Sequence, residues 1–234
     1  MLGDSMLSPY FADPGARVDE DHMQLIGMLD SPYVRRVAIA LIVAKTPFTH
    51  RPISLFRHID QFSKLNPLLK APTLVADDGT ALMDSGVILD YLASVEPRIA
   101  ALTPSNAPER LRALRATGLA LTVMEKAVQR HYERLLRPEE KRHEPWVDRV
   151  MGQLTAGLSA LNAELPRSGW IGVELGLADI SVPCAFGFTE SVLADLVQTD
   201  RYSNLAAFSA RAEALPAFRA APPQDGVMAV ALGD

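Results

Sequence analysis

The chain has 234 residues, of which 48% are hydrophobic and 22% charged, and its formal net charge is -5. An acidic protein without a basic run is a poor partner for nucleic acid or for an anionic membrane surface. The longest uninterrupted apolar stretch, Val37 to Ala44, is too short to span a bilayer. The single cysteine, Cys184, excludes an internal disulfide framework and indicates a reducing compartment, so we expect a cytoplasmic protein.

The first 22 residues differ from the rest of the chain. They are rich in acidic side chains and contain Pro9 and Pro14, and they show no periodic apolar pattern. They have neither the basic start nor the apolar segment of a signal peptide. We therefore expect residues 1–22 to be a disordered extension, with the folded part beginning at Met23. Packing of this segment as an arm on the folded part is the alternative.

From Met23 to about Glu96 the pattern alternates between strands and helices. The predicted strands cover residues 24–29, 48–55, 73–76 and 81–83. The predicted helices cover residues 32–45 and 86–95, with a weaker helix before Asn66. Pro32 suits the first helical position, because its missing N–H would be unpaired there anyway. The order βαβ, followed by ββα, predicts a mixed sheet between helices.

After Pro97 the strand signals stop and the rest of the chain is helical. The predicted helices cover residues 111–137, 146–165, 178–197 and 204–215. The sequence therefore predicts an α/β domain followed by an all-α domain. We place the first domain at residues 23–97, a linker at residues 98–107, and the helical domain at residues 108–234.

Ser31 stands at the turn between the first predicted strand and the first predicted helix. Backbone N–H groups in the first turn of a helix lack partners, so a negative ligand is favoured there. A serine at this position can hold a thiolate that a substrate brings, but it cannot form a disulfide. A structural N-cap is the simpler interpretation of Ser31 when it is taken alone.

A second segment, Asn66-Pro67-Leu68-Leu69-Lys70-Ala71-Pro72-Thr73-Leu74, leads into the third predicted strand. If the Ala71–Pro72 bond is cis, the backbone of Ala71 turns outward and can pair with a peptide-like ligand. An ordinary proline turn is the alternative. Lys70 can meet a ligand carboxylate, although most surface lysines are simply solvated.

The third segment is Asp84-Ser85, at the start of the helix that follows the predicted hairpin. Ser85 and the free N–H groups after it form a natural seat for a carboxylate. Asp84 can accept a hydrogen bond from a ligand ammonium group. A plain helix cap is again the simpler interpretation of this pair when it is read by itself.

In this order and spacing, the three segments resemble the glutathione transferase family. The similarity runs from Met23 to about Pro222. It includes Ser31-Pro32-Tyr33-Val34-Arg35-Arg36-Val37, Asp84-Ser85-Gly86-Val87-Ile88-Leu89-Asp90-Tyr91-Leu92, Leu177-Ala178-Asp179-Ile180, Tyr202-Ser203-Asn204-Leu205-Ala206-Ala207-Phe208 and Leu215-Pro216-Ala217-Phe218. The resemblance implies a thioredoxin-like first domain that binds glutathione, followed by a C-terminal helical bundle. It also implies a homodimer and a hydrophobic electrophile as second substrate.

Carried over residue by residue, the resemblance implies that Ser31 is catalytic and donates its hydroxyl to the glutathione sulfur. Ala71, before a cis proline, would pair with the cysteinyl backbone. Asp84 and Ser85 would hold the γ-glutamyl end, and Lys70 is the candidate for the glycyl carboxylate. The implied glutathione-binding residues are therefore Lys70, Ala71, Pro72, Asp84 and Ser85.

The implied function is that of a glutathione S-transferase, with glutathione as co-substrate and no metal. The thiolate of glutathione, stabilised by Ser31, would attack an electrophilic small molecule held against the helix that contains Met124, Val128 and Tyr132. An apolar stripe at helical spacing is more often core or subunit contact, so we assign no site residue on this helix. A glutathione-dependent isomerase, dehalogenase or peroxidase is an alternative. A catalytically silent module of the same fold, which binds partner proteins, is another.

Two features of the sequence limit other chemistry. The histidines show no metal-ligand spacing with one another, and Cys184 has the setting of a buried small hydrophobe.

One position departs from the family pattern: Gly176, three residues before Asp179, where the family usually has serine or threonine. The capping box is therefore incomplete, but glycine still caps tolerably, so we expect the fold to be kept.

Overall fold

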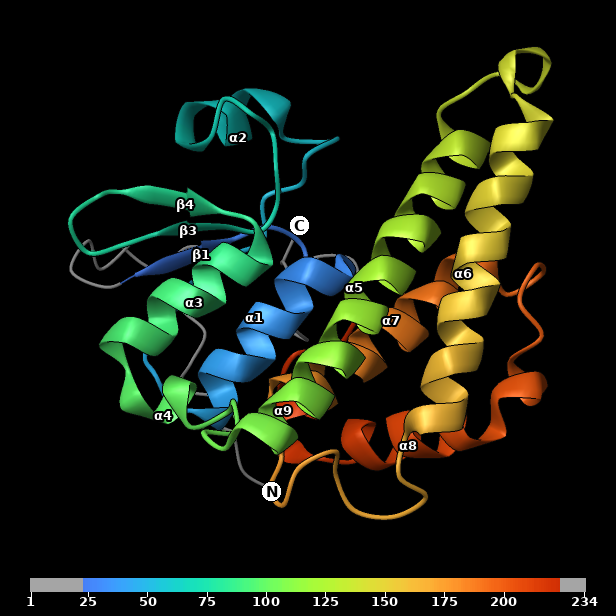
Figure 1. The fold of residues 1–234 in the computed structure, drawn as a ribbon. Coiled ribbons are helices and arrows are strands. Elements are labelled where there is room, and N and C mark those ends of the chain that lie inside the picture. The colour runs from blue at the N-terminus through green and yellow to red at the C-terminus, as the bar shows by residue number, and fades with distance from the viewer. Residues whose placement is uncertain (1–22, 224–234) are drawn as a thin grey trace, which may run out of the picture. The chain divides into compact units, whose positions relative to one another are not determined.

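A computed structural model describes residues 23–223 of the chain, and its fold is drawn in Figure 1. The described residues form two compact units, residues 23–100 with 216–223, and residues 101–215. The first unit is α/β and the second is helical, as the order of predicted elements indicates. Residues 1–22, for which the sequence predicts a disordered extension, lie outside the described part.

The first unit contains every strand and helix that the sequence predicts for it, although the first three strands are shorter than predicted. The strands are β1 (Gln24–Ile26), β2 (Thr49–Arg51), β3 (Thr73–Val75) and β4 (Ala81–Met83). The helices are α1 (Pro32–Val43), α2 (Ile59–Leu65), α3 (Ser85–Val95), α4 (Pro97–Ala100) and α9 (Pro216–Ala220). Of these, α4 falls where the sequence predicts a linker.

The sheet is mixed, with the strand order β2-β1-β3-β4. β1 runs parallel to β2, where Leu25 pairs with His50, and antiparallel to β3, where Leu25 pairs with Leu74. β3 and β4 form an antiparallel hairpin. This arrangement confirms the predicted βαβ and ββα order, and it is the thioredoxin-like fold.

Helices cover both faces of the sheet: α1 and α3 lie on one face and α2 on the other (Figure 1). Neighbouring residues of β1 point to opposite faces. On the α2 face, Ile26 packs in one cluster with Ile53 and Phe62. α1 is buried along most of its length, from Val34 to Ile42. Since burial of a large apolar side chain contributes about 1.5–3 kcal/mol, α1 is held firmly in the unit that carries Ser31.

The last described helix, α9, groups with the first unit rather than with the helical one. Arg35 of α1 joins the two: its Nε donates to the carbonyl of Ala221 at 2.7 Å, and its guanidinium lies 5.7 Å from the ring centre of Phe218. A carbonyl and an aromatic face together stabilise the buried charge. The predicted helical domain ran from residue 108 to the end of the chain, whereas the described chain returns to the first unit at Pro216.

The second unit is helical throughout. Its elements are α5 (Ala107–Leu135), a 3-10 turn (Glu139–Lys141), α6 (Glu144–Glu164), α7 (Leu177–Leu193), a second 3-10 turn (Thr199–Tyr202) and α8 (Ser203–Glu213). α5 packs along α6 and α7, and α8 packs against both of these. α5 begins earlier than predicted, because the Asn106 side chain caps it by accepting from the Glu109 N–H at 3.0 Å. No helix within residues 23–223 is both long and apolar enough to cross a membrane.

The N-terminus of α7 is capped without a side-chain hydroxyl, because its N-cap residue is Gly176. Gly176 has no side chain, so only the reciprocal half of a capping box forms: Asp179 Oδ2 accepts from the Gly176 N–H at 2.8 Å. Asp179 Oδ1 accepts from the Ile171 N–H at 2.8 Å. Burial raises the pKa of the Asp179 carboxyl, and these two donors oppose that rise. A Cβ on Gly176 would lie 2.7 Å from the carbonyl oxygen of Leu102, so the close backbone approach requires glycine here.

We predict that Gly176→Ser, which adds a hydroxyl at the N-cap of α7, lowers the free energy of unfolding by about 1–3 kcal/mol. The added Cβ meets a backbone oxygen, which cannot rotate away as a side chain can. Urea denaturation followed by circular dichroism measures the effect. Gly152→Ala is the control, because a Cβ there meets nothing within 4 Å. A gain in stability from Gly176→Ser would contradict this account of the helix start.

Candidate functional site

Ser31 is the N-cap of α1. Its carbonyl accepts the first helical hydrogen bond from the Arg35 N–H at 2.9 Å, and its Oγ lies 3.5 Å from the Val34 nitrogen. That second contact is at the outer limit for a hydrogen bond, so the side-chain cap is weak. In it the hydroxyl oxygen accepts, which leaves the O–H free to donate to a ligand. Ser31 is half-buried at the start of the helix.

Gly27 brings the loop before β3 against the first turn of α1. A Cβ at Gly27 would lie 2.6 Å from Cγ2 of Val34 and 3.1 Å from Cβ of Ala71, and the φ of Gly27 is +133°. Both the space and the backbone angle therefore require glycine. The Ala71–Pro72 peptide bond is cis. The sequence analysis requires a cis bond here if the backbone of Ala71 is to face outward. Ala71 is half-buried.

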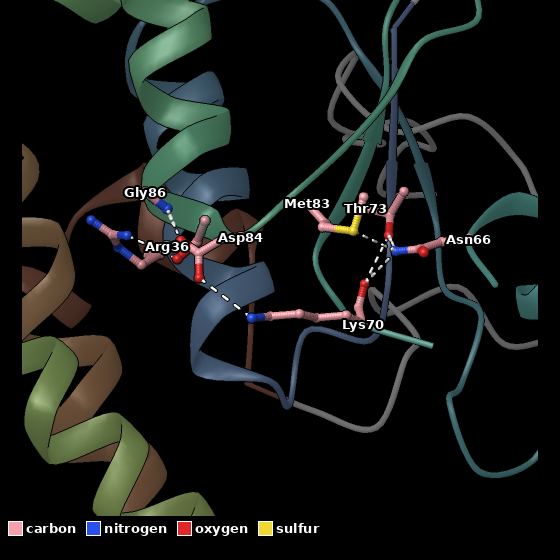
Figure 2. A network of polar contacts seen from close by, with 8 residues as sticks. Arg36, Asn66, Lys70, Thr73, Met83, Asp84 and Gly86 are labelled. Carbon is pink, nitrogen blue, oxygen red and sulfur yellow. Dashed lines mark hydrogen bonds and ion pairs between the residues drawn. The ribbon is translucent and has the colours of Figure 1, made fainter. Parts of the chain in front are cut away.

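Asn66 holds this loop together, a role that the sequence analysis did not assign to it. The side chain is 1% exposed, and its Oδ1 accepts from the Leu68 N–H at 3.0 Å. Its Nδ2 donates to Thr73 Oγ1 at 2.9 Å and to the Lys70 carbonyl at 3.3 Å, as Figure 2 shows. The Thr73 hydroxyl donates to the same carbonyl at 2.8 Å. Asn66 thus fixes the backbone that leads to the cis bond.

Asp84 caps α3 with an unusual backbone, at φ 73° and ψ 126°. Such values are rare for a residue other than glycine, and strain of this kind gathers at binding sites. The carboxylate accepts from the Gly86 N–H at 2.8 Å and lies 3.7 Å from the Lys70 Nζ. Both charged side chains are more than half exposed, so this ion pair is weak and can open to a ligand.

The structure therefore places Lys70 beside Asp84 at the start of α3 (Figure 2). The family resemblance implies different ends of the ligand for the two: the glycyl carboxylate for Lys70 and the γ-glutamyl end for Asp84. In the described structure they form one charged pair, with the buried Ser85 next to Asp84 in the chain.

Arg36 is a residue of this site that the sequence analysis missed. It is 2% exposed, and its Nη1 donates to the Oγ of Ser85 at 2.9 Å. Arginine is almost never fully buried unless it is paired. The available signal was the Arg35-Arg36 pair, because it interrupts a helix that is otherwise apolar as far as Val43. A solvated helix face does not account for two adjacent cations in such a sequence.

His50 of β2 supports Gly27 from the neighbouring strand. Its Nε2 lies 2.8 Å from the Gly27 carbonyl oxygen, and the residue is buried. Burial lowers the pKa of His50 to about 4. The ring is therefore neutral at pH 7 and its Nε2–H donates to the carbonyl, which fixes the strand end just before Ser31.

The helix against which the sequence places the electrophile is α5, in the helical unit. Met124 is fully buried, Val128 is half-buried and Tyr132 is 36% exposed. The face of α5 that contains these three residues is therefore buried at Met124 and reaches the surface at Tyr132. Cys184 is buried, in line with its predicted setting. Within residues 23–223, no three His, Cys, Asp or Glu side chains gather in a group that could hold a metal ion.

Two family models match the chain. The N-terminal domain of glutathione S-transferase matches residues 25–98, and the C-terminal domain of glutathione S-transferase matches residues 144–211. The first match contains Ser31, the cis-proline loop and the start of α3, and the second lies within the helical unit. The chain belongs to the glutathione S-transferase family.

Relatives of the chain carry more than one activity. A solved glutathione S-transferase from Methylobacterium radiotolerans, in complex with glutathione sulfonate, is 30% identical with a TM-score of 0.77, over 84% of this chain and 92% of that one. Another, from Methylobacillus flagellatus with glutathione bound, is 28% identical with a TM-score of 0.78, over 86% and 100%. Maleylacetoacetate isomerase from Pseudomonas aeruginosa is 28% identical over 80% of this chain and 90% of that protein.

We predict that Asn66→Ala lowers the free energy of unfolding by about 2–3 kcal/mol, since it leaves buried groups of the loop without partners. Thr73→Val removes the hydroxyl that also donates to the Lys70 carbonyl. Because the two side chains bond one another, the double variant should lose less stability than the sum, by at least about 0.5 kcal/mol. Urea denaturation of the four proteins measures this coupling. Strict additivity would show that the network does not act as a unit.

We predict that the free energy of unfolding falls as the pH is lowered from about 6.5 to about 4. In that window an unfolded His50, with its ordinary pKa of 6.5, binds a proton that the folded ring excludes, so acid favours the unfolded chain. The full effect is on the order of 3 kcal/mol, and it is absent above the window. Urea denaturation at several pH values should show a smaller dependence in His50→Gln than in the wild type. The exposed His143→Gln is the control, and an unchanged pH dependence in His50→Gln would contradict the assignment.

Proposed function

We propose that the protein binds glutathione at the first unit and joins it, through its sulfur, to an electrophilic carbon of a hydrophobic second substrate. The observation that carries the proposal is the Ser31 hydroxyl at the start of α1, weakly capped and able to donate. Membership of the family and the glutathione-bound relatives support it.

In this proposal each part of the tripeptide would meet a group of the first unit. The Ser31 O–H would donate to the sulfur, and the backbone of Ala71, before the cis bond, would pair with the cysteinyl residue. The start of α3 would take the γ-glutamyl end, where Asp84 accepts from the ammonium group and Ser85 with the free N–H groups meets the carboxylate. Lys70 remains the candidate for a carboxylate, and its position beside Asp84 also brings it within reach of the γ-glutamyl end.

The energy that the mechanism requires is modest. A thiol with an ordinary pKa of about 8.5 is mostly protonated at neutral pH, and the thiolate is the nucleophile. Lowering that pKa by about two units requires roughly 2.7 kcal/mol. A hydrogen bond to a charged acceptor contributes about 1.5–3 kcal/mol, and a helix N-terminus adds roughly 0.3–1 kcal/mol. One serine hydroxyl at a helix start is therefore sufficient.

The reaction would proceed by attack of the bound thiolate on the electrophilic carbon. A carbon–sulfur bond forms, and the electron pair leaves with a departing group such as a halide, or is taken up as a carbanion that water protonates. The thiol proton passes to solvent. The rate gain would come from the supply of thiolate and from holding the two reactants together.

A glutathione-dependent isomerase is the second candidate, because a maleylacetoacetate isomerase is among the relatives. In such a reaction the thiolate adds to an activated double bond, the adduct rotates, and the thiolate leaves again without being consumed. An assay with an aryl halide and an assay of double-bond isomerisation separate the two, since only the first consumes glutathione.

We predict that millimolar glutathione raises the melting temperature of the protein, because a ligand that binds only the native state stabilises it. Absence of a shift at saturation would exclude both enzymatic proposals and favour a silent binding module. This measurement should precede any assay of activity.

We predict that Ser31→Ala lowers the rate of conjugation at pH 7 by roughly 10- to 100-fold while glutathione still binds. The loss should shrink as the pH is raised, because the bound thiol then ionises without help. Ser94→Ala, which removes an exposed hydroxyl on α3, is the control and should keep the wild-type rate. If Ser31→Ala kept the full rate at every pH, Ser31 would be only a helix cap and would have no role in catalysis.

A further inference from the structure

A buried arginine joins the first turn of α1 to the segment at the end of α9. The backbone N–H of Arg35 donates to the Ser31 carbonyl at 2.9 Å, which is the first hydrogen bond of the helix. Its side chain is 2% exposed, and its Nε donates to the Ala221 carbonyl at 2.7 Å and its Nη2 to the Phe218 carbonyl at 3.4 Å. One residue therefore contacts both the Ser31 turn and a segment that follows it by more than 180 residues.

The groups that Arg35 meets are themselves held in place. Phe218 and Ala221 are both 0% exposed, and the Phe218 ring centre lies 5.7 Å from the guanidinium carbon. The Ala221 N–H donates to the Phe218 carbonyl at 3.2 Å, which closes the last turn of α9. A guanidinium at the C-terminal end of a helix satisfies carbonyls that have no partner inside it. The contact is therefore specific to the end of α9.

The Ser31 turn depends on such contacts because its own cap is weak. Ser31 Oγ lies 3.5 Å from the Val34 nitrogen, at the outer limit for a hydrogen bond. Val34 holds one side of the turn by packing at Gly27, and Arg35 holds another, since neighbouring residues of a helix point about 100° apart. A hydrogen bond weakens steeply when donor and acceptor are misaligned. A small rotation of this turn would therefore weaken the donation of Ser31 to a bound sulfur.

We propose that Arg35 is a positioning residue for the bound thiolate, and that it makes the donor geometry of Ser31 depend on the segment at residues 218–221. The inference rests on the proposed binding of glutathione and on the donor role of Ser31. It extends that site to α9, which no part of the proposed reaction uses. A merely structural arginine would, when replaced, lower the stability of the protein without any effect on the ionisation of the ligand.

The test measures the pKa of the glutathione thiol on the protein, by the ultraviolet absorbance of the thiolate during a pH titration at saturating glutathione. Arg35→Met keeps the apolar stem and removes the donors. It should raise the apparent pKa of the bound thiol by at least about 0.5, while glutathione still binds at a pH well below that pKa. Arg219→Met, which removes an exposed cation from α9, is the control and should leave the thiol pKa unchanged.

Two further variants separate positioning from a direct effect of charge. Phe218→Leu keeps every charge and removes the ring beneath the guanidinium, so it should raise the thiol pKa in the same direction by a smaller amount. In a Ser31→Ala background, Arg35→Met should cause no further rise, because the effect passes through the Ser31 hydroxyl. If Arg35→Met does not fold, Arg35→Lys takes its place, since lysine keeps the charge but loses the planar fork.

The outcomes distinguish this inference from the proposed function. A wild type that does not bind glutathione, or whose bound thiol keeps its ordinary pKa, overturns both. A lowered thiol pKa that is the same in the Arg35 and Phe218 variants overturns the role of Arg35 and leaves the proposed function in place. A rise that persists unchanged in Ser31→Ala would show direct action of the charge, and it also overturns the positioning role. A rise in both variants that disappears without Ser31 supports the assignment.

Discussion

The site depends on the absence of a side chain at Gly27. At this point β1 ends, the first turn of α1 begins, and the loop before β3 closes in, with Val34 and Ala71 both inside the space that a Cβ would fill. His50 holds the carbonyl of the same glycine from β2. Elements from separate parts of the sequence therefore meet at one backbone position. The distance between the Ser31 hydroxyl and the cis-proline loop follows from this packing, and any displacement of Gly27 would alter both together.

The starts of α1 and α3 differ in a way that suits two different parts of one ligand. At α1 the donor is a neutral hydroxyl, with no acidic residue in the first turn, which fits a soft and polarisable thiolate. At α3 the groups are formally charged: Asp84 and Lys70 at the surface and Arg36 beneath them. Such an asymmetry favours one orientation of a peptide that carries a thiol in its middle and an amino acid group at its end.

The element order, the mixed sheet and the helical second unit follow from periodicity and turn residues, and all of these were predictable from the sequence. The positions of Ser31, Ala71 and Asp84 at element boundaries were predictable for the same reason. Long-range polar contacts were not. Arg36 of α1 donates to Ser85 of α3, and nothing local in the sequence predicts that pairing. The return of the chain to the first unit at Pro216 was also not predictable from local patterns, because it depends on what α9 packs against.

A redox protein of this fold would carry thiols at the start of α1. This chain has Ser31 and Val34 there instead, and these residues constrain the chemistry of the first unit. Val34, on the first turn of α1, is fully buried, and its methyl group approaches the position of a Gly27 Cβ to 2.6 Å, so it serves packing. Cys184, the single cysteine of the chain, is buried in the other unit. A nucleophilic sulfur at Ser31 must therefore arrive with a ligand. A protein that keeps a donor at this place while it lacks a thiol of its own is suited to activating a borrowed one.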